Sequence, residues 1–306
     1  MALKLVGPDF FDLSALLSEE EIAIQNMTNE WVKNRFYPLI SKHYREGTFP
    51  FELQKEMGGM GFFGSTLPEK YDTAGINSVA YGLMMQELER GDSGLRSFAS
   101  VQGSLVMWPI WKYGSEVQKQ KWLPLLASGE KIGCFGLTEP DYGSNPGGMI
   151  TRVKHEGDNF ILNGTKMWIT NSPVADVALI WAKDEGGEVR GFLVERGTPG
   201  FETPEIKGKL SLRASVTGEI VLSNCEIPLE NQLPEADGLK APLSCLTQAR
   251  YGINWGVMGS AIACYEEAVD YAKTRIQFDK PIAAFQLTQQ KLAEMLNEIT
   301  KAQFLT

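Results

Sequence analysis

The chain has 306 residues, of which 43% are hydrophobic and 22% are charged, a balance that is ordinary for a globular protein. Its formal net charge is −9, which argues against nucleic acid and against an anionic membrane surface as the main partner. A phosphorylated cofactor is not excluded, because a few backbone amides and arginines are enough to bind phosphate groups.

Few side chains suit metal ligation or nucleophilic catalysis. Only two histidines are present, His43 and His155, and both lie among charged residues. We therefore expect neither a histidine-ligated metal nor a Ser-His-Asp triad. The cysteines are far apart and form no Cys-x-x-Cys pair, which predicts buried, reduced thiols. They are Cys134, Cys225, Cys245 and Cys264. Proton transfer would then fall to a carboxylate, and oxidation to a cofactor.

The sequence also indicates where in the cell the protein is expected. Residues 1–9 lack the apolar core of a signal peptide and the Arg- and Ser-rich composition of a transit peptide. No apolar run approaches the roughly 18 residues that a membrane helix needs. We therefore predict a cytoplasmic protein with no membrane partner.

The first predicted domain covers residues 1–131 and is helical. Ser18 and Glu21 form a capping box at the start of its first long helix. Apolar residues then recur at helical spacing in several further stretches. These stretches are residues 51–57, 79–88, 102–113 and 117–126.

Residues 59–64, Gly-Met-Gly-Phe-Phe-Gly, match the G-x-G-x-x-G dinucleotide fingerprint. That fingerprint requires a strand before it and a helix after it, because the pyrophosphate binds at the helix N-terminus. Here residues 51–57 have a helical pattern, and residues 65–68 have the pattern of an extended turn. We therefore interpret these glycines as a helix stop and a tight connection.

Residues 132–238 are predicted to form a β domain, either a sandwich or a barrel of short strands. Asn163-Gly164 favours a type I′ turn and predicts a hairpin within residues 160–169. Further short segments are rich in β-branched or aliphatic residues. They are residues 177–182, 191–194 and 219–222.

Residues 239–306 are predicted to begin a helical bundle. No proline occurs between Pro242 and Pro281, and the apolar residues keep helical spacing over about 30 residues, roughly 45 Å of helix. A second helix is expected from Phe285, and it reaches Thr306 without a stop signal. We expect a longer parent protein, with about 80 more residues for two further bundle helices and a closing helix. The predicted fold class is therefore α+β: a helical domain, a small β domain and an incomplete helical bundle.

Two segments of the β domain suit a planar cofactor. Residues 134–145 begin as a strand and end in a polar loop that carries the hydroxyls of Thr138 and Ser144. Residues 166–172 place Trp168 at a strand end, where an indole can stack on a ring while neighbouring hydroxyls donate hydrogen bonds. Taken alone, the first segment also fits a β-turn at the domain edge, and Trp168 also fits a core aromatic.

Together these two segments resemble the acyl-CoA dehydrogenase family, and the order of domains is similar to that family along the whole chain. The resemblance implies FAD as the cofactor. In the family the first segment lines the flavin and the thioester, and the second covers the isoalloxazine ring. The flavin-binding residues that the resemblance implies are Phe135, Leu137, Thr138, Gly143, Ser144, Trp168, Ile169 and Thr170, and Ser144 is also implied to contact the substrate.

Residues 275–281, Arg-Ile-Gln-Phe-Asp-Lys-Pro, and the following Gln286 resemble a further family motif. The resemblance implies that Arg275, Phe278 and Gln286 reach FAD across a dimer interface, in a homo-oligomer built as a dimer of dimers. Asp279 stands where the family has glycine, which leaves the turn geometry open. Taken alone, Arg275 also fits a cation favoured near a helix C-terminus.

Residues 87–102 resemble the glutaryl-CoA dehydrogenase branch of the family. The resemblance implies that Arg96 and Ser97, with Ser100 beside them, bind the distal carboxylate of the substrate. A charge that enters an apolar pocket has to be paired, and arginine can pair with it through two hydrogen bonds. Taken alone, Arg96 also fits a surface ion pair.

Residues 243–252 resemble the CoA-contacting segment of the same branch. The substrate contacts that this resemblance implies are Leu243, Ser244, Leu246, Thr247 and Arg250. Taken alone, Arg250 also fits an ordinary charge on a helix face.

The resemblance implies FAD-dependent α,β-dehydrogenation of glutaryl-CoA, then loss of CO₂ to give crotonyl-CoA, as a step of amino-acid catabolism. Reduced flavin would pass electrons to an electron-transfer flavoprotein. The catalytic base of this branch is a glutamate in a Tyr-Glu-Gly-Thr-like segment that has no match here, and we expect it beyond Thr306. Two alternatives stay open: a short-chain or non-decarboxylating acyl-CoA dehydrogenase, and a non-catalytic protein that binds CoA esters or acts as a scaffold.

Overall fold

The computed structural model describes residues 8–306, which divide into two compact units. The first unit comprises residues 1–38, of which 8–38 are described, with residues 78–96 and 252–306. The second comprises residues 39–77 and 97–251. Residues 1–7, on which part of the targeting prediction depends, lie outside the described residues. Within residues 8–306, no helix has both the length and the apolar character that a membrane span requires.

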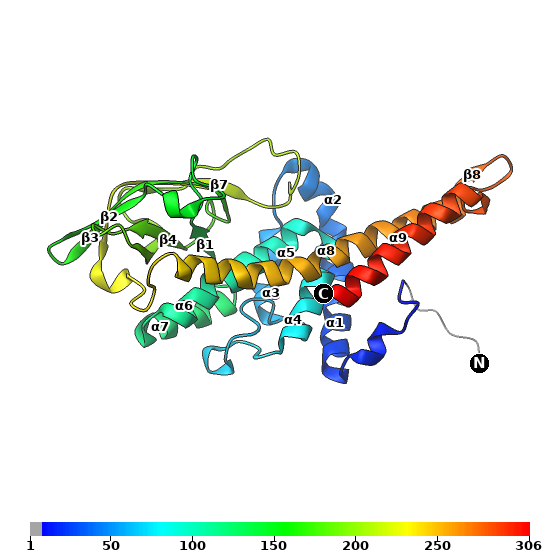
Figure 1. The fold of residues 1–306 in the computed structure, drawn as a ribbon, viewed down its shortest axis with the longest axis horizontal. Coiled ribbons are helices and arrows are strands. Elements are labelled where there is room, and N and C mark those ends of the chain that lie inside the picture. Colours follow the sequence, from blue (N-terminus) through cyan, green and yellow to red (C-terminus); the bar gives the residue numbers. More distant parts are fainter. Residues whose placement is uncertain (1–7) are drawn as a thin grey trace. The chain divides into compact units, whose positions relative to one another are not determined.

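The helices follow the chain in the order drawn in Figure 1. Their bounds are α1 Glu19–Trp31, α2 Tyr37–Glu46, α3 Gln54–Gly59, α4 Ser78–Gly91, α5 Ser93–Ser100, α6 Trp108–Tyr113, α7 Glu116–Ala127, α8 Lys240–Thr274 and α9 Gln286–Leu305. Within residues 8–306, two segments are π-helical, η2 at Val32–Phe36 and η5 at Val101–Met107. The predicted capping box is confirmed, since Ser18 Oγ accepts a hydrogen bond from the Glu21 amide and the Glu21 carboxylate accepts one from the Ser18 amide.

In the first unit, α8 approaches α4 closely because glycines lie at the contact. A Cβ atom at Gly82 of α4 would lie 2.3 Å from the Trp255 ring, and one at Gly259 of α8 would lie 1.8 Å from the Gln86 carbonyl oxygen. No side chain fits at such distances, so the backbone of α4 at Gly82 packs on the Trp255 ring, and the backbone of α8 at Gly259 packs on the backbone of α4.

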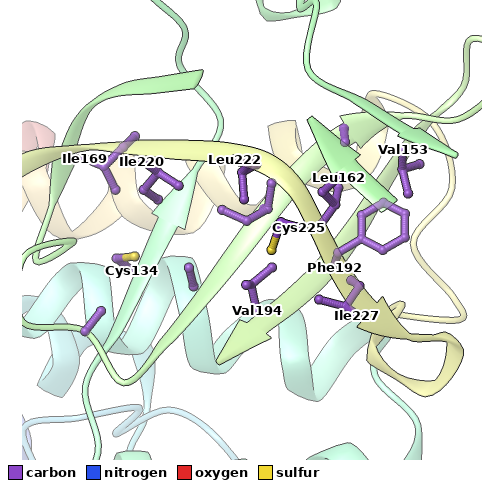
Figure 2. Packing of buried hydrophobic residues seen from close by; sticks show 14 residues of the cluster. Cys134, Val153, Leu162, Ile169, Phe192, Val194, Ile220, Leu222, Cys225 and Ile227 are labelled. Atoms are coloured by element: carbon purple, nitrogen blue, oxygen red, sulfur yellow. The ribbon is translucent and has the colours of Figure 1, made fainter. Parts of the chain in front are cut away.

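The second unit contains a curled sheet with the strand order β1-β4-β2-β3-β7-β6, and β5 pairs with β4. The strand bounds are β1 Gly133–Gly136, β2 Arg152–Glu156, β3 Asn159–Thr170, β4 Val177–Lys183, β5 Val189–Glu195, β6 Phe201–Glu202 and β7 Thr217–Pro228. Side chains from these strands meet in one apolar core, where Cys134, Leu162 and Phe192 are fully buried (Figure 2). This core fixes the ends of β1 and β3.

The hairpin predicted at Asn163-Gly164 is wrong. Strand β3 runs unbroken through both residues, and the turn lies earlier, between Glu156 and Asn159. Gly164 has φ +149°, and a Cβ atom there would lie 2.4 Å from Thr151 Oγ1. The glycine therefore allows Thr151 to approach the backbone of β3 closely, and it does not form a turn. It lies at a register shift in the pairing of β3 with β7.

The glycine-rich segment after α3 is confirmed as a helix stop. Helix α3 ends at Gly59, and Gly61 and Gly64 both have positive φ, at +73° and +60°. The element before them is a helix, so the dinucleotide fingerprint has no structural basis here.

The long bundle helix and its successor are also confirmed, as α8 and α9, and a hairpin joins them (Figure 1). Its strands are β8 Ile276–Gln277 and β9 Lys280–Pro281. Phe278 and Asp279 at the turn have φ +52° and +60°, the pattern of a type I′ turn. Aspartate tolerates the left-handed region better than most residues, so the turn forms without the glycine of the family motif.

Candidate functional site

A cavity of about 290 Å³ opens in the second unit, at the ends of β1 and β3. Residues from five segments line it. They are Val101, Leu105, Phe135, Leu137, Thr138, Gly143, Ser144, Pro146, Trp168, Ile169, Thr170, Leu243, Leu246 and Arg250. The eight residues predicted to bind flavin in the β domain are all among them, and so are four of those predicted to bind substrate: Ser144, which is in both sets, and Leu243, Leu246 and Arg250.

Trp168 is held in an unusual position on the cavity wall. The register of β3 against β7 shifts between Lys166 and Ile169, and Trp168 has φ +60°. A β-bulge of this kind turns a side chain away from the sheet's regular alternation. As a result the indole is 57% exposed, so its interpretation as a core aromatic is wrong. A positive φ at a bulky residue is costly and is typical of a functional site.

Three hydroxyls on the cavity wall are available to a ligand. Among residues 8–306, the side chains of Thr138, Ser144 and Thr170 have no hydrogen-bond partner in the protein. The backbone of two of them is held in place, because the Met167 amide donates to the Thr138 carbonyl over 2.9 Å and Thr170 pairs with Thr217 of β7. The cavity therefore offers fixed but unused hydrogen-bonding groups around an exposed indole.

The π-helix η5 supplies a wall that the sequence analysis missed. Val101 and Leu105, one π-helical turn apart, both line the cavity. Between them Gln102 is fully buried; its amide nitrogen donates to the Leu126 and Lys131 carbonyls, and its oxygen accepts from the Gly133 amide. These bonds tie η5 to the start of β1. The four-residue spacing of two apolar residues was the available signal.

A second candidate site lies in the first unit, at the junction of α4 and α5. Arg96 Nε donates to Glu89 Oε2 over 2.6 Å, and Ser93 Oγ donates to Glu89 Oε1 over 2.8 Å. The side chains of Glu89 and Arg96 are only 4% and 11% exposed. Within the described chain, the terminal nitrogens of Arg96 have no partner, so they remain free to bind an anion.

Comparison with known proteins places these features in a family. Models of the N-terminal, middle and C-terminal domains of acyl-CoA dehydrogenase match residues 18–130, 134–225 and 236–306. The chain belongs to the acyl-CoA dehydrogenase family.

Individual relatives differ in substrate. A glutaryl-CoA dehydrogenase from Mycobacterium smegmatis, solved in complex with FADH2, is 52% identical with a TM-score of 0.96, over 98% of this chain and 78% of that one. The human mitochondrial short-chain specific acyl-CoA dehydrogenase is 35% identical over 96% of this chain and 72% of its own length. A structure described for the electron transferring flavoprotein of Acidaminococcus fermentans is 33% identical with a TM-score of 0.90, over 94% of this chain and 78% of that one.

The predicted family and fold class are confirmed by these matches. The predicted domain limits at residues 131 and 238 stay predictions, and so do the roles of the individual site residues. Relatives of this family are FAD-dependent oxidoreductases, and this chain's cavity suits such a cofactor. Its volume lies near the lower end of ligand pockets, about 300–1,000 Å³, which fits a ring system better than a whole dinucleotide.

Several predicted substrate residues lie outside the cavity lining. Ser97 and Ser100 do not line it, and Ser244 forms a hydrogen bond of 2.7 Å with the Tyr113 hydroxyl. Thr247 is exposed, and its hydroxyl donates to the Leu243 carbonyl. Arg250 does line the cavity, and it has no acidic partner among residues 8–306.

The hairpin residues of the first unit are available to a partner. Arg275, Phe278 and Gln286 are exposed, and Phe278 reaches 85% exposure at the turn. Phe285 packs edge-to-face against Phe278, and the Lys280 ammonium lies 4.3 Å from the centre of the Phe285 ring. These contacts hold an aromatic side chain out from the hairpin.

The cysteines carry no evident chemistry. All four are free, and burial raises the pKa of the Cys134 thiol to about 12. Such a thiol stays protonated and unreactive. The prediction of burial is wrong for Cys264, which is exposed on α8. In the part of the chain that the structure describes, no group of three or more acidic, cysteine or histidine residues could hold a metal.

Proposed function

We propose that this protein is an FAD-dependent dehydrogenase of glutaryl-CoA, which it converts to crotonyl-CoA and CO₂. The observation that carries this proposal is the arrangement of Arg96, whose guanidinium is hydrogen-bonded to Glu89. Its terminal nitrogens are unused, its Nε is held by Glu89, and its side chain is largely buried. A guanidinium oriented in this way suits a carboxylate, because it presents two parallel donors.

FAD would supply the oxidation, by accepting a hydride from the β-carbon of the acyl group. The residues that would hold its ring system are those of the cavity in the second unit. Trp168 would stack against the ring, and the hydroxyls of Thr138, Ser144 and Thr170 would donate to its heteroatoms. The apolar walls of Val101 and Leu105 would exclude water from the acyl chain.

The base that removes the α-proton is not assigned to a cavity residue. Among the described residues that line the cavity there is no aspartate, glutamate or histidine. The prediction of a glutamate beyond Thr306 stays a prediction. Arg250, which lines the cavity and lacks an acidic partner, is a candidate for contact with the CoA phosphates or the flavin.

Two partners belong to the proposal. Electrons would leave through an electron-transfer flavoprotein, in keeping with the similarity to a structure described for that system in Acidaminococcus fermentans. The exposed side chains of Arg275, Phe278 and Gln286 would contact the FAD of a second copy of the chain in a homo-oligomer.

A short-chain acyl-CoA substrate is the second candidate, favoured by the 35% identity to the human short-chain enzyme. The two candidates differ at Arg96, since an uncharged acyl chain has no use for an arginine. Charge-assisted hydrogen bonds contribute about 1.5–3 kcal/mol each, so loss of a two-bond contact lowers kcat/KM by at least about 100-fold.

The deciding experiment compares Arg96→Gln with the wild type on glutaryl-CoA and on butyryl-CoA. We expect a drop of about 100-fold in kcat/KM for glutaryl-CoA and little change for butyryl-CoA. Arg190→Gln is the matched control, because Arg190 forms ion pairs on the β domain with Asp184 and Asp237. Equal losses on both substrates would assign Arg96 a structural role and favour the short-chain candidate.

A further inference from the structure

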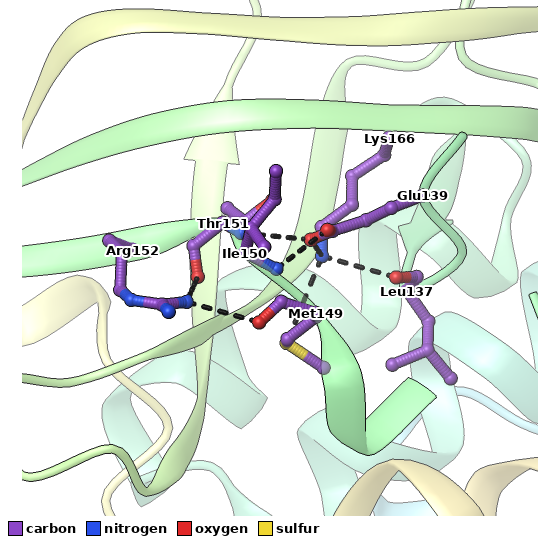
Figure 3. A network of polar contacts seen from close by, with 7 residues as sticks. All are labelled: Leu137, Glu139, Met149, Ile150, Thr151, Arg152 and Lys166. Carbon is purple, nitrogen blue, oxygen red and sulfur yellow. Dashed lines mark hydrogen bonds and ion pairs between the residues drawn. The ribbon is translucent and has the colours of Figure 1, made fainter. Parts of the chain in front are cut away.

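The second unit contains an ion pair that the cavity chemistry leaves unexplained. Lys166 of β3 and Glu139, which follows β1, have side chains 0% and 1% exposed. The Lys166 ammonium lies 2.9 Å from Glu139 Oε1 (Figure 3). Charged groups this deep are rare unless function or specificity requires them, because desolvation is costly.

The Lys166 ammonium has three partners in the protein, and the Glu139 carboxylate accepts three hydrogen bonds. Besides Glu139, the Lys166 ammonium donates to the Leu137 carbonyl over 3.1 Å and contacts the Met149 sulfur at 4.0 Å. The Glu139 carboxylate accepts from the amides of Ile150 and Thr151, over 2.7 and 3.0 Å. Figure 3 shows these contacts converging from three separate stretches of chain.

Each of those stretches continues directly into the cavity wall. Leu137 and Thr138, which line the cavity, directly precede Glu139. The loop that follows Glu139 contains residues 143–146 of the cavity wall, and it is closed by the hydrogen bonds from the Ile150 and Thr151 amides to the Glu139 carboxylate. Lys166 lies two residues before Trp168 on β3. The pair therefore ties together, at one buried point, the segments that carry the unused hydroxyls and the exposed indole.

Stability alone does not account for the pair. Well-packed apolar residues of similar volume usually stabilise a fold as well as a buried ion pair does. Burial also disfavours the Lys166 ammonium and lowers its pKa to about 8, while Glu139 opposes that shift. What an ion pair adds over apolar packing is a fixed length and direction between its partners.

We propose that Glu139 and Lys166 are positioning residues of the flavin site, which set the distance between the loop of Thr138 and Ser144 and the strand end of Trp168. They touch neither flavin nor substrate and act through the segments that they join. This inference rests on the proposed function, because it requires that the cavity bind FAD.

The test separates position from stability with two variants. Glu139→Asp keeps the charge but shortens the side chain by one methylene, so the loop must shift to keep the contact. The double variant Lys166→Met with Glu139→Gln removes both charges and leaves no unpaired one. For each, we measure the dissociation constant for FAD by quenching of flavin fluorescence, and the melting temperature of the flavin-free protein.

We expect both variants to bind FAD about tenfold more weakly than the wild type. Their flavin-free melting temperatures should stay within about 4 °C of the wild type, the range of a small change in stability for a chain of this size. Lys154→Met is the control: its ion pair with Glu156 is exposed on β2 of the same sheet, and FAD binding should not change.

Unchanged FAD binding in Glu139→Asp would overturn the inference, even if the double variant fails to fold. The inference would also be overturned if the double variant folded with the stability of the wild type and bound FAD with the same affinity as the wild type. A wild-type protein that binds no FAD would instead contradict the proposed function, so the two failures are distinguishable.

Discussion

Two buried carboxylate–cation pairs, Glu139–Lys166 in the second unit and Glu89–Arg96 in the first, differ in how many of their donors the protein uses. At Lys166 all three ammonium donors have partners, and Glu139 accepts two backbone amides besides. At Arg96 only Nε is engaged within the described chain, although a guanidinium carries five N–H donors. A saturated pair can only hold structure in place, whereas a pair with spare donors can also bind a ligand.

The largest expected effect tests this contrast through stability. Glu139→Gln would leave the fully buried Lys166 without its counter-charge, and we expect a loss of about 3–5 kcal/mol in the free energy of unfolding. Glu89→Gln should cost only about 1 kcal/mol, because the Arg96 side chain is 11% exposed, against 0% for Lys166, and keeps a neutral hydrogen-bond acceptor at Nε. Urea unfolding of the flavin-free variants measures both values. Similar losses would show that the two pairs play the same structural role.

A smaller effect is expected for Arg96→Lys. Lysine keeps the charge but lacks the planar guanidinium. It therefore cannot donate one hydrogen bond to Glu89 and, at the same time, two parallel hydrogen bonds to a substrate carboxylate. We expect kcat/KM for glutaryl-CoA to fall about tenfold, against little change for butyryl-CoA. A lysine variant as active as the wild type would mean that charge alone, without the fork, determines recognition at this pair.

The smallest expected effect is a dependence of the free energy of unfolding on acid at the Glu139–Lys166 pair. Burial favours the neutral acid, but the Ile150 amide and the Lys166 charge outweigh it and hold the pKa of Glu139 below its ordinary value of 4.5. A carboxyl with a lowered folded-state pKa stabilises the fold above its unfolded pKa, and loses this contribution as pH falls through the folded value.

The stability advantage of the wild type over Glu139→Gln should therefore be constant at neutral pH and shrink below about pH 4.5. Unfolding measured from pH 7 downwards checks this expectation. An advantage that persists unchanged in acid would show that the Glu139 carboxylate is not what stabilises the loop.

The sequence predicted the cavity of the second unit better than it predicted the sheet around it. Thr138, Ser144 and Trp168 could be selected because they lie in compact segments whose resemblance to the family is local. Asn163-Gly164 misled the analysis because turn chemistry is also local, whereas the path of β3 depends on pairing with β2 and β7. A two-residue turn motif carries no information about which distant segments pair as strands.

The buried pair was missed for a related reason. Glu139 and Lys166 are 27 residues apart, and neither side chain reveals its partner in the sequence. A signal existed: Lys166 has the same strand parity as the buried Leu162, so regular alternation in β3 already directs a lysine inwards. The exposure of Trp168, which shares that parity, could not be foreseen because it depends on the bulge.

Gly256 of α8 limits how the Glu89–Arg96 pair can change. A Cβ atom there would lie 2.1 Å from Glu89 Oε2 and 3.3 Å from Arg96 Nε, so even alanine would displace the pair. Helix α8 can make room only by giving up its close packing on α4 at Gly259, where a Cβ atom would lie 1.8 Å from the Gln86 carbonyl oxygen. A larger residue at position 256 therefore cannot adjust the geometry of the pair by small steps. With the substrate role proposed for Arg96, a change of acyl group at this pair would require substitution of Glu89 or Arg96 themselves.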